Sequence, residues 1–490
     1  MKSSESRISI IGAGFAGVSI AAEIRRKGIL GTVVAFLDDD EQKIGTRVDS
    51  IPVLGPINDV IELLQRTPAD EALIAMPGAS RERLRQIYLV LLRAGFRSIR
   101  IVPSVAEIVD GEAHLIQTRQ INPEDLLGRN PVRMNLRESL GYLRGKRVLI
   151  TGAGGSIGSE LARQLLSGGA ERLYLFDHGE NSLYEIDKEL KLLQEEGVGE
   201  SATIVPVVGE LQDRDYMNFI MQRLQADAVF HAAAHKHVPM MEANPVEAVK
   251  NNVFGTENLV QASLSAGVKR FVMISTDKAV APSSVYGASK RIAEQIVLAG
   301  HGDRGAYMVV RFGNVLGSRG SIIPLFQQQI QKGGPVTLTH PEVTRYFMTI
   351  SEASALVLQA GGVGRSGELY VLDMGEPVRI RDVAEQMIRF YGFEPERDIK
   401  IETVGLRPGE KLFESLFEPE ERPKPTEHAR LNRLTHVDLI PELETLLEQL
   451  RPVCFAHTGR EELYRNRRAL REAIAQAIPT VTVPEYEPAY

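Results

Sequence analysis

The sequence has little cysteine, no long apolar run and no excess of positive charge. Its 490 residues include one cysteine, Cys454, which excludes a disulfide framework and a cysteine-based metal site. The net charge of −7 gives nucleic-acid binding no electrostatic support. No apolar stretch reaches the roughly 18 residues that a transmembrane helix needs, and the N-terminus lacks the apolar core of a signal peptide. We therefore expect a cytoplasmic protein with no membrane span in this chain and no nucleic-acid partner.

A chain of 490 residues is too long for one ordinary hydrophobic core, so more than one domain is expected. Two strand–glycine-turn–helix units open near residues 7 and 147, and each is followed by alternating strands and helices. The expected strands cover residues 33–37, 72–75 and 98–101 after the first unit, and 172–176, 228–231, 271–274 and 307–311 after the second. This alternation predicts an α/β protein with two Rossmann-like parallel-sheet domains.

Glycine and proline residues that interrupt the helices and strands suggest the domain boundaries. We expect an N-terminal nucleotide-binding domain over residues 1–120, a linker over 121–145 and a catalytic domain over 146–434. The catalytic domain should contain a smaller C-terminal substrate-binding region. Beyond Gly375 the pattern predicts helices separated by prolines, and residues 435–490 are expected to form a helical tail.

The second glycine turn has the spacing of a dinucleotide cradle. Gly152, Gly155 and Gly158 frame Ser156 and Ile157, directly after an apolar strand. Glycine is required where the backbone takes positive φ and where a side chain would block the pyrophosphate, and the following helix offers free N–H groups to that anion. A glycine-rich turn without a ligand is the plain alternative.

Asp177 strengthens this interpretation. It follows Gly158 by about 20 residues, where an acidic side chain holds the adenosine ribose of a dinucleotide. A carboxylate at that position repels a 2′-phosphate, so NAD is favoured over NADP. The competing interpretation is a solvated acidic residue on a loop.

The first glycine turn, with Gly12, Gly14 and Gly17, also has the spacing of a dinucleotide site. Asp38 follows Gly17 at about the same distance as Asp177 follows Gly158. Residues 1–145 contain no set of side chains for hydride transfer. The turn therefore indicates either a second nucleotide site, regulatory or vestigial, or a purely structural α/β domain.

Tyr286 and Lys290 are four residues apart, so they share one face if a helix begins there. A tyrosine so placed can take the proton of a substrate alcohol as hydride leaves for nicotinamide. The Lys290 ammonium would lower the phenol pKa and hold the nicotinamide ribose. Thr276, at the end of the preceding strand, can hydrogen-bond the same alcohol.

Residues 275–290, with the pattern S-T-D-K-A-V-x-P-x-x-x-Y-G-A-S-K, resemble the extended short-chain dehydrogenase/reductase superfamily. More narrowly they resemble UDP-N-acetylglucosamine 4,6-dehydratases of the CapD-like polysaccharide-biosynthesis family. The supporting segments are residues 36–40, 52–55, 124–129, 231–239, 311–320, 344–348 and 405–411. Many longer members carry Met at the position of Tyr286, so the stereochemical outcome at C5 stays open. Longer members usually begin with several transmembrane helices, so the chain is expected either to be naturally soluble or to have been trimmed before residue 1.

The resemblance implies a UDP-sugar substrate, expected to be UDP-N-acetylglucosamine, an NAD cofactor and a homo-oligomer. It adds Ala232, Ala233 and Ser275 to the cofactor-binding residues. The substrate-binding residues that it implies are Lys236, Asn314, Arg345, Arg407 and Glu410.

Asp277 and Lys278 distinguish a dehydratase from a simple dehydrogenase. Oxidation at C4 acidifies the C5 hydrogen, so Lys278 could remove that proton while Asp277 protonates the departing C6 hydroxyl. Lys278 must be neutral to do so, and we expect Lys290 and the oxidised nicotinamide to depress its pKa. The plain alternative is a solvent-facing ion pair.

Two other functions remain open. A UDP-sugar 4-epimerase shares the hydride set but has no use for Asp277 and Lys278, and a non-catalytic NAD sensor needs neither set. His231, His235 and His237 lack an acidic partner, so no metal site is expected.

Overall fold

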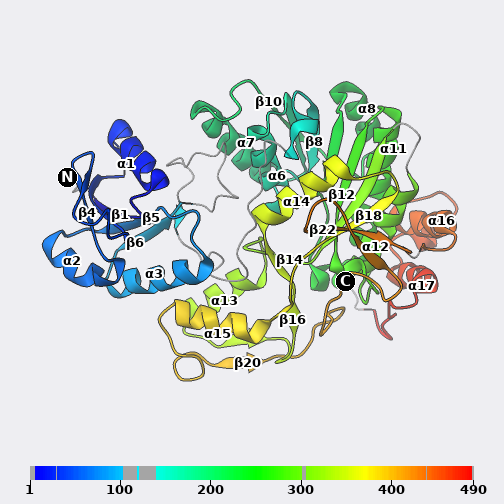
Figure 1. The fold of residues 1–490 in the computed structure, drawn as a ribbon. Coiled ribbons are helices and arrows are strands. Elements are labelled where there is room, and N and C mark those ends of the chain that lie inside the picture. Colours follow the sequence, from blue (N-terminus) through cyan, green and yellow to red (C-terminus); the bar gives the residue numbers. More distant parts are fainter. Residues whose placement is uncertain are drawn as a thin grey trace. The chain divides into compact units, whose positions relative to one another are not determined.

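The computed structural model describes residues 6–28, 30–102, 119–120, 139–300, 305–437 and 439–487. The chain divides into two compact units, residues 1–134 with 389–393 and residues 135–388 with 394–490. Each unit is built on its own sheet (Figure 1). The segment 124–129 and most of the expected linker lie outside the described residues.

The sheet of the first unit has the order β3-β4-β2-β1-β5-β6-β7. Its central strands are parallel, and the two edge pairs are antiparallel. The strands are β1 (Arg7–Ile11), β2 (Thr32–Leu37), β3 (Arg47–Val48), β4 (Ile51–Leu54), β5 (Glu71–Ile74), β6 (Ser98–Ile101) and β7 (Arg119–Gln120), and the helices α1 (Phe15–Lys27), α2 (Val60–Arg66) and α3 (Arg81–Arg93). Parallel strands are covered on both faces, which explains why Ile10, Ile11 and Phe36 are all fully buried.

The second unit has a larger sheet with the order β10-β9-β8-β11-β12-β13-β18-β22-β21. The first seven strands in this order are parallel, and β22 and β21 run antiparallel at one edge. The strands are β8 (Arg147–Thr151), β9 (Arg172–Asp177), β10 (Thr203–Val208), β11 (Ala228–His231), β12 (Arg270–Thr276), β13 (Ala306–Phe312), β18 (Glu368–Leu372), β21 (Arg422–Pro425) and β22 (Leu431–Thr435). The predicted fold class, α/β with two Rossmann-like sheets, is confirmed.

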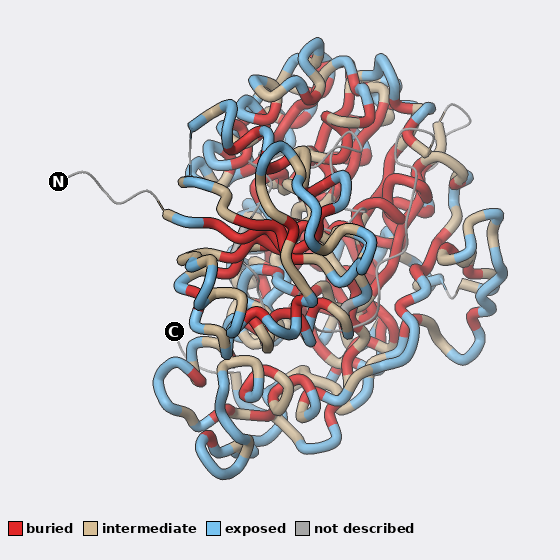
Figure 2. Tube along the Cα trace, turned by 60° about the vertical axis from the view of Figure 1, so that its left-hand side comes forward, coloured by how far each residue is buried: buried red, intermediate tan, exposed pale blue. Residues whose placement is uncertain are grey.

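Helices connect the parallel strands of this sheet. They are α6 (Ser156–Ser167), α7 (Glu180–Glu195), α8 (Arg214–Leu224), α11 (Gly255–Ser265), α12 (Val285–Ala299) and α14 (Ile350–Val363). Their apolar faces and the strands form the core, which Figure 2 shows as the red segments of the tube. His231 lies in this core, where its two ring nitrogens contact the hydroxyls of Thr151 and Thr256 at 2.7 and 2.9 Å.

A smaller region extends from the carboxyl edge of the large sheet. It contains short paired strands and two helices, α13 (Ile322–Gln331) and α15 (Ile380–Phe390). The pairs are β14 (Asn314–Leu316) with β17 (Phe347–Thr349), β15 (Val336–Leu338) with β20 (Ile401–Thr403), and β16 (Thr344–Arg345) with β19 (Val378–Arg379). These strands bring several of the predicted substrate-binding residues to one place.

The expectation of a purely helical pattern beyond Gly375 is wrong, because β21 and β22 return to the large sheet. The prolines Pro423 and Pro425 obscured β21, and they are tolerated because β21 is the edge strand. The C-terminal helices α16 (Leu443–Cys454) and α17 (Arg467–Ala477) are present and pack against α10 (Pro245–Val249) of the same unit.

Two buried residues belong to these last helices. Arg471 of α17 donates to Glu242 Oε2 at 2.7 Å, so the terminal helix is tied to the rest of the second unit. Burial raises the pKa of the Cys454 thiol to about 12, which keeps it inert. Among the described helices, none has the length and apolarity needed to cross a bilayer.

Candidate active site

The loop after β8 is a cradle that only glycine can form. Gly152 has φ of 68°, and a Cβ there would lie 2.7 Å from the backbone nitrogen of Ala233. A Cβ on Gly158 would lie 2.0 Å from the Gly152 carbonyl oxygen. Helix α6 starts at Ser156 and directs its free N–H groups to this loop. The residues present therefore fit the pyrophosphate of a dinucleotide.

Asp177, the last residue of β9, is fixed beside this cradle. Its Oδ2 accepts the Gly154 N–H at 2.9 Å, and its Oδ1 accepts the Gly179 N–H at 2.8 Å. Its side chain is 8% exposed. The two backbone donors fix the orientation of the carboxylate beside the glycine turn, where the predicted ribose contact requires it.

The first unit repeats this arrangement in detail. Asp38 Oδ2 accepts the Ala13 N–H at 2.7 Å, and Oδ1 accepts the Asp40 N–H at 3.0 Å. Gly12 has φ of 103°, and a Cβ on Gly17 would lie 2.1 Å from the Gly12 carbonyl oxygen. The turn therefore has the local geometry of the cradle in the second unit, and nucleotide binding there stays a prediction.

Thr276 ends β12 at the carboxyl edge of the large sheet and caps the short helix η6 (Asp277–Ala279), where its Oγ1 accepts the Lys278 N–H at 3.4 Å. Its hydroxyl donates to Asp277 Oδ1 at 2.8 Å. The strand end therefore presents the alcohol-binding hydroxyl and the Asp277–Lys278 pair together.

Tyr286 and Lys290 lie one turn apart on α12, as predicted. The helix starts after Ser284, whose hydroxyl caps its first turn. Lys290 Nζ donates to the Ile274 carbonyl at 2.8 Å, which ties α12 to β12. Burial lowers the pKa of Lys290 to about 8.

One cavity of about 800 Å³ connects the cradle with these side chains. The predicted cofactor-binding and catalytic residues that line it are Gly152, Gly155, Ser156, Ile157, Gly158, Ala232, Ser275, Thr276, Lys278, Tyr286 and Lys290. Asp177 and Ala233 adjoin the cradle through the contacts given above. All of these side chains belong to the second unit.

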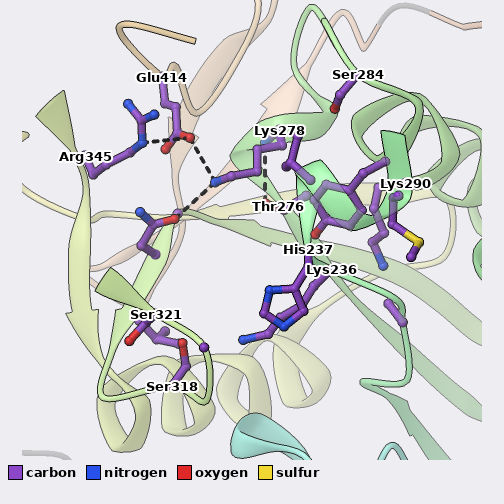
Figure 3. Close-up of a pocket in the computed structure, with 18 of the residues that line it drawn as sticks. Lys236, His237, Thr276, Lys278, Ser284, Lys290, Ser318, Ser321, Arg345 and Glu414 are labelled. Atoms are coloured by element: carbon purple, nitrogen blue, oxygen red, sulfur yellow. Dashed lines mark hydrogen bonds and ion pairs between the residues drawn. The ribbon is translucent and has the colours of Figure 1, made fainter. Parts of the chain in front are cut away.

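Lys278 contacts three side chains at the cavity. Its Nζ lies 3.0 Å from Asp277 Oδ1, 2.9 Å from Glu414 Oε1 and 3.1 Å from Asn314 Oδ1. Figure 3 shows its side chain directed toward Glu414 and away from Lys290. The side chain of Asp277 is 0% exposed and that of Lys278 24%, so the pair is not the solvent-facing ion pair of the alternative interpretation.

These contacts contradict the expected protonation of Lys278. Burial acts to lower its pKa, but the carboxylates of Asp277 and Glu414 outweigh burial and raise the pKa above its ordinary value. The expectation that Lys290 depresses it is wrong, because the sequence did not reveal the second carboxylate. Lys278 therefore holds its proton in this structure.

The expected pKa of Tyr286 also needs correction. Burial raises the pKa of the phenol to about 12, and the cation that opposes this shift most is Lys278. Lys290 does not lower it as expected, because its ammonium is directed to the Ile274 carbonyl.

Glu414 is a site residue that the sequence reasoning missed. Its Oε1 also accepts from Arg345 Nε at 3.1 Å, and its side chain is 3% exposed. Burial, followed by the negative charge of Asp277, raises the pKa of Glu414 to about 7 against the opposing effect of Lys278. Only its position in the segment after Lys411, already singled out by the resemblance, could have pointed to it.

The five predicted substrate-binding residues all line the cavity. Arg407 pairs with Glu410, with Nε 3.0 Å from Oε1, and Lys236 Nζ donates to the Arg319 carbonyl at 2.8 Å. Arg345 differs from the expectation in its contacts, because its guanidinium donates to Glu414 and to backbone carbonyls of 344, 411 and 412. Its contact with a diphosphate remains a prediction.

Comparison with known proteins relates this fold and site to a family. Residues 148–436 match the polysaccharide biosynthesis protein family, and residues 3–103 match a CoA-binding domain. The capsular polysaccharide biosynthesis protein CapD of Staphylococcus aureus is 43% identical over 444 residues, which cover 88% of this chain and 73% of that protein. The X-ray structure of Pen from Bacillus thuringiensis has a TM-score of 0.53 at 32% identity, and covers 61% of this chain and 90% of that one.

Two further relatives carry names for an activity. UDP-N-acetylglucosamine 4,6-dehydratase (inverting) of Campylobacter jejuni is 31% identical over 56% of this chain and 78% of its own length. UDP-glucose 4-epimerase of Rickettsia rickettsii is 33% identical over 57% of this chain and 80% of its own length. The chain belongs to the CapD-like polysaccharide biosynthesis family, within the extended short-chain dehydrogenases/reductases.

Proposed function

We propose that this chain is an NAD-dependent 4,6-dehydratase of a UDP-hexose, with UDP-N-acetylglucosamine as the expected substrate. The observation that carries the proposal is the position of the Asp277–Lys278 pair. Lys278 lines the same cavity as Thr276 and Tyr286, with Asp277 3.0 Å from its ammonium. Hydride chemistry and proton transfer can therefore act on adjacent carbons of one sugar.

The first step is the oxidation of the C4 alcohol. Thr276 hydrogen-bonds the alcohol, and Tyr286 in its phenolate form takes the alcohol proton as the hydride leaves. The glycine cradle and Asp177 would hold NAD, which would supply the acceptor for the C4 hydride and the source of the hydride for C6. Lys290 holds the nicotinamide ribose from the same face of α12.

The second step is the loss of water across C5 and C6. The C4 ketone acidifies the C5 hydrogen, and Lys278 as free amine removes it. Asp277 protonates the C6 oxygen, so the C6–O bond breaks and water leaves. Each such proton transfer contributes about 10²–10⁴ in rate. Hydride return to C6 then gives a UDP-4-keto-6-deoxy sugar.

The diphosphate of the substrate needs local cations in a chain of net charge −7. Arg407 and Lys236 line the cavity, and the Arg407 side chain is 55% exposed, so its guanidinium can turn to a phosphate. Asn314, Arg345 and Glu410 complete the proposed substrate contacts.

A 4-epimerase is the rival within the same superfamily, because the Rickettsia relative is as similar as the dehydratase. Epimerisation uses only the hydride set, and it leaves the buried Asp277–Lys278–Glu414 cluster without a role. A non-catalytic NAD sensor would leave Thr276, Tyr286 and Lys290 without one. The dehydratase is the function that uses both sets.

The proposal is tested by incubating the protein with UDP-N-acetylglucosamine and NAD in D₂O and following the sugar by NMR. Loss of the C6 hydroxyl with deuterium at C5 is expected, and the C5 configuration of the product distinguishes retention from inversion. A C4 epimer that keeps its C6 hydroxyl and its C5 hydrogen would show an epimerase instead. No change with any UDP-hexose would overturn both.

A further inference from the structure

Asp277 and Glu414 each have one buried oxygen without a donor. Asp277 Oδ1 accepts from Thr276 and Lys278, and Glu414 Oε1 accepts from Lys278 and Arg345. Asp277 Oδ2 and Glu414 Oε2 have no hydrogen-bond partner among the described residues. Both carboxyl groups contact the Lys278 ammonium, at 3.0 and 2.9 Å, and each shifts the pKa of the other. Buried polar atoms are rarely left unpaired, and one proton between the two groups would satisfy both oxygens.

The titratable side chains around these two carboxyl groups come from four elements. Lys278 is on η6, Arg345 on β16, Tyr286 on α12, and Lys411 on the loop that leads to Glu414. The pKa of Asp277 is lowered, because Lys278 and its hydrogen bonds outweigh burial. The pKa of Glu414 is raised to about 7, mainly by burial. Glu414 is therefore the carboxyl that exchanges a proton most readily near neutral pH.

We propose that Glu414 carries a proton from Lys278 to Asp277 and thereby prepares the base and the acid of the dehydration together. This inference rests on the proposed function. Glu414 acts through its two neighbours, so it is a positioning residue that does not itself react with the sugar.

The proton balance of the cycle closes within the cluster. A proton moves from Lys278 Nζ to Glu414 Oε1, which leaves a free amine. The neutral Glu414 carboxyl then rotates, which brings this proton to the position that Oε2 occupies, and the proton passes to Asp277 Oδ2. In the elimination, the amine takes the C5 proton, the C5–H electrons form the C5–C6 double bond, and Asp277 gives its proton to the departing C6 oxygen. Lys278 ends as ammonium and both carboxyls end ionised, as they started.

Direct transfer from Lys278 to Asp277 is the competing route, since their atoms lie 3.0 Å apart. It delivers the proton to Oδ1, which already accepts from Thr276 and Lys278. The route through Glu414 uses the two oxygens that have no donor. A substitution that prevents Glu414 from exchanging a proton, but keeps the shape of its side chain, distinguishes the two routes.

The test is Glu414→Gln, compared with wild type in three measurements on UDP-N-acetylglucosamine. These are reduction of bound NAD by absorbance, deuterium uptake at C5 in D₂O, and formation of the dehydrated sugar. We expect NAD reduction to persist, while C5 exchange and dehydration fall about 10²–10⁴-fold. In Asp277→Asn, C5 exchange should survive better than dehydration, because the base can still be freed.

The pH profile supplies a readout that a merely structural role would not move. Glu414 must be ionised to accept the Lys278 proton, so wild-type kcat/KM should fall as pH drops through about 7. This acid limb should be absent in Glu414→Gln, and Glu414→Asp should recover part of the rate. Glu352→Gln is the matched control, because it removes a buried carboxylate that pairs with Arg430 at 3.0 Å away from the cavity.

Each other outcome overturns the inference. If Glu414→Gln dehydrates the sugar at the wild-type rate, or if its kcat/KM still falls below about pH 7, direct proton transfer from Lys278 to Asp277 suffices. Loss of NAD reduction together with dehydration shows that Glu414 only maintains the site. If the wild-type protein oxidises C4 but never dehydrates, the proposed function fails, and the relay fails with it.

Discussion

The Nζ of Lys278 lies 3.0 Å from Oδ1 of Asp277, so two residues that are adjacent in sequence also form a buried ion pair in space. Ion pairs between sequence neighbours are usually exposed and contribute little. Here Lys278 lines a cavity that Tyr286 and Lys290 also line, and its partner Asp277 is fully buried. The arrangement places an acid and a base next to the side chains proposed for hydride transfer.

Lys278→Ala should therefore separate oxidation from elimination. We expect dehydration to fall by about 10²–10⁴-fold, while UDP-N-acetylglucosamine still reduces bound NAD through Thr276, Tyr286 and Lys290. Stopped-flow absorbance and product NMR measure the two steps. Lys191→Ala, which breaks a surface pair with Asp187 at 2.6 Å, is the control and should leave both steps intact. Elimination by Lys278→Ala at the normal rate would show that the base is assigned wrongly.

Asp177→Asn should weaken the preference for NAD over NADP. The variant removes the negative charge that we propose faces the ribose, and hydrogen bonds to charged groups are worth about 1.5–3 kcal/mol, or about 10- to 100-fold in affinity. Calorimetric titration with both nucleotides measures the change. Asp38→Asn, the matching substitution in the first unit, should not alter the nucleotide preference of the dehydration reaction. An unchanged preference in Asp177→Asn would exclude Asp177 from the cofactor site.

Two glycines of the first unit test whether its turn binds a nucleotide. A Cβ on Gly14 meets nothing within 4 Å, whereas one on Gly17 would lie 2.1 Å from a backbone oxygen. Gly14→Ala should keep the melting temperature of the wild type and reduce NAD binding from two sites per chain to one. Gly17→Ala should also lower the melting temperature. Titration of the protein with NAD and with coenzyme A measures the number of nucleotide sites per chain. One site in the wild type would indicate that the first unit has only a structural role.

Arg311 supports the catalytic elements from within the core. Its side chain is 0% exposed and pairs with Glu294 of α12 at 2.8 Å and with Glu421 at 2.9 Å. Arg311→Met removes the nearer cation from two buried carboxylates, which Arg291 contacts only at 3.6 and 3.4 Å, so we expect a loss of about 3–5 kcal/mol in unfolding free energy. Arg433→Met, which breaks a partly exposed pair with Glu368, should cost much less. Denaturant titration measures both, and equal losses would contradict this role of Arg311.

The sequence predicts the parts of this molecule that local patterns specify. The two glycine turns, the strand that ends at Thr276 and the helix that carries Tyr286 and Lys290 lie where the spacing places them, because each depends on a short segment. The edge strand β21 was not predicted, because prolines such as Pro423 and Pro425 usually interrupt strands. The sheet tolerates these prolines because β21 lies at its edge.

Glu414 was missed for a different reason. It is far from Lys278 in the chain, and only the fold brings its carboxylate to 2.9 Å from the Lys278 ammonium. Together with the neighbouring Asp277, this contact reverses the expected shift in the pKa of Lys278. Protonation in a buried site depends on all charges nearby, so it could not be predicted from the residues next to Lys278 alone.

The central claim, that hydride from C4 returns to C6 after loss of water, is tested most directly with UDP-N-acetylglucosamine carrying deuterium at C4. The dehydratase account predicts a product whose C6 methyl group holds that deuterium and whose C4 is a ketone, by NMR and mass spectrometry. Deuterium that returns to C4 in a sugar with an intact C6 hydroxyl would contradict it.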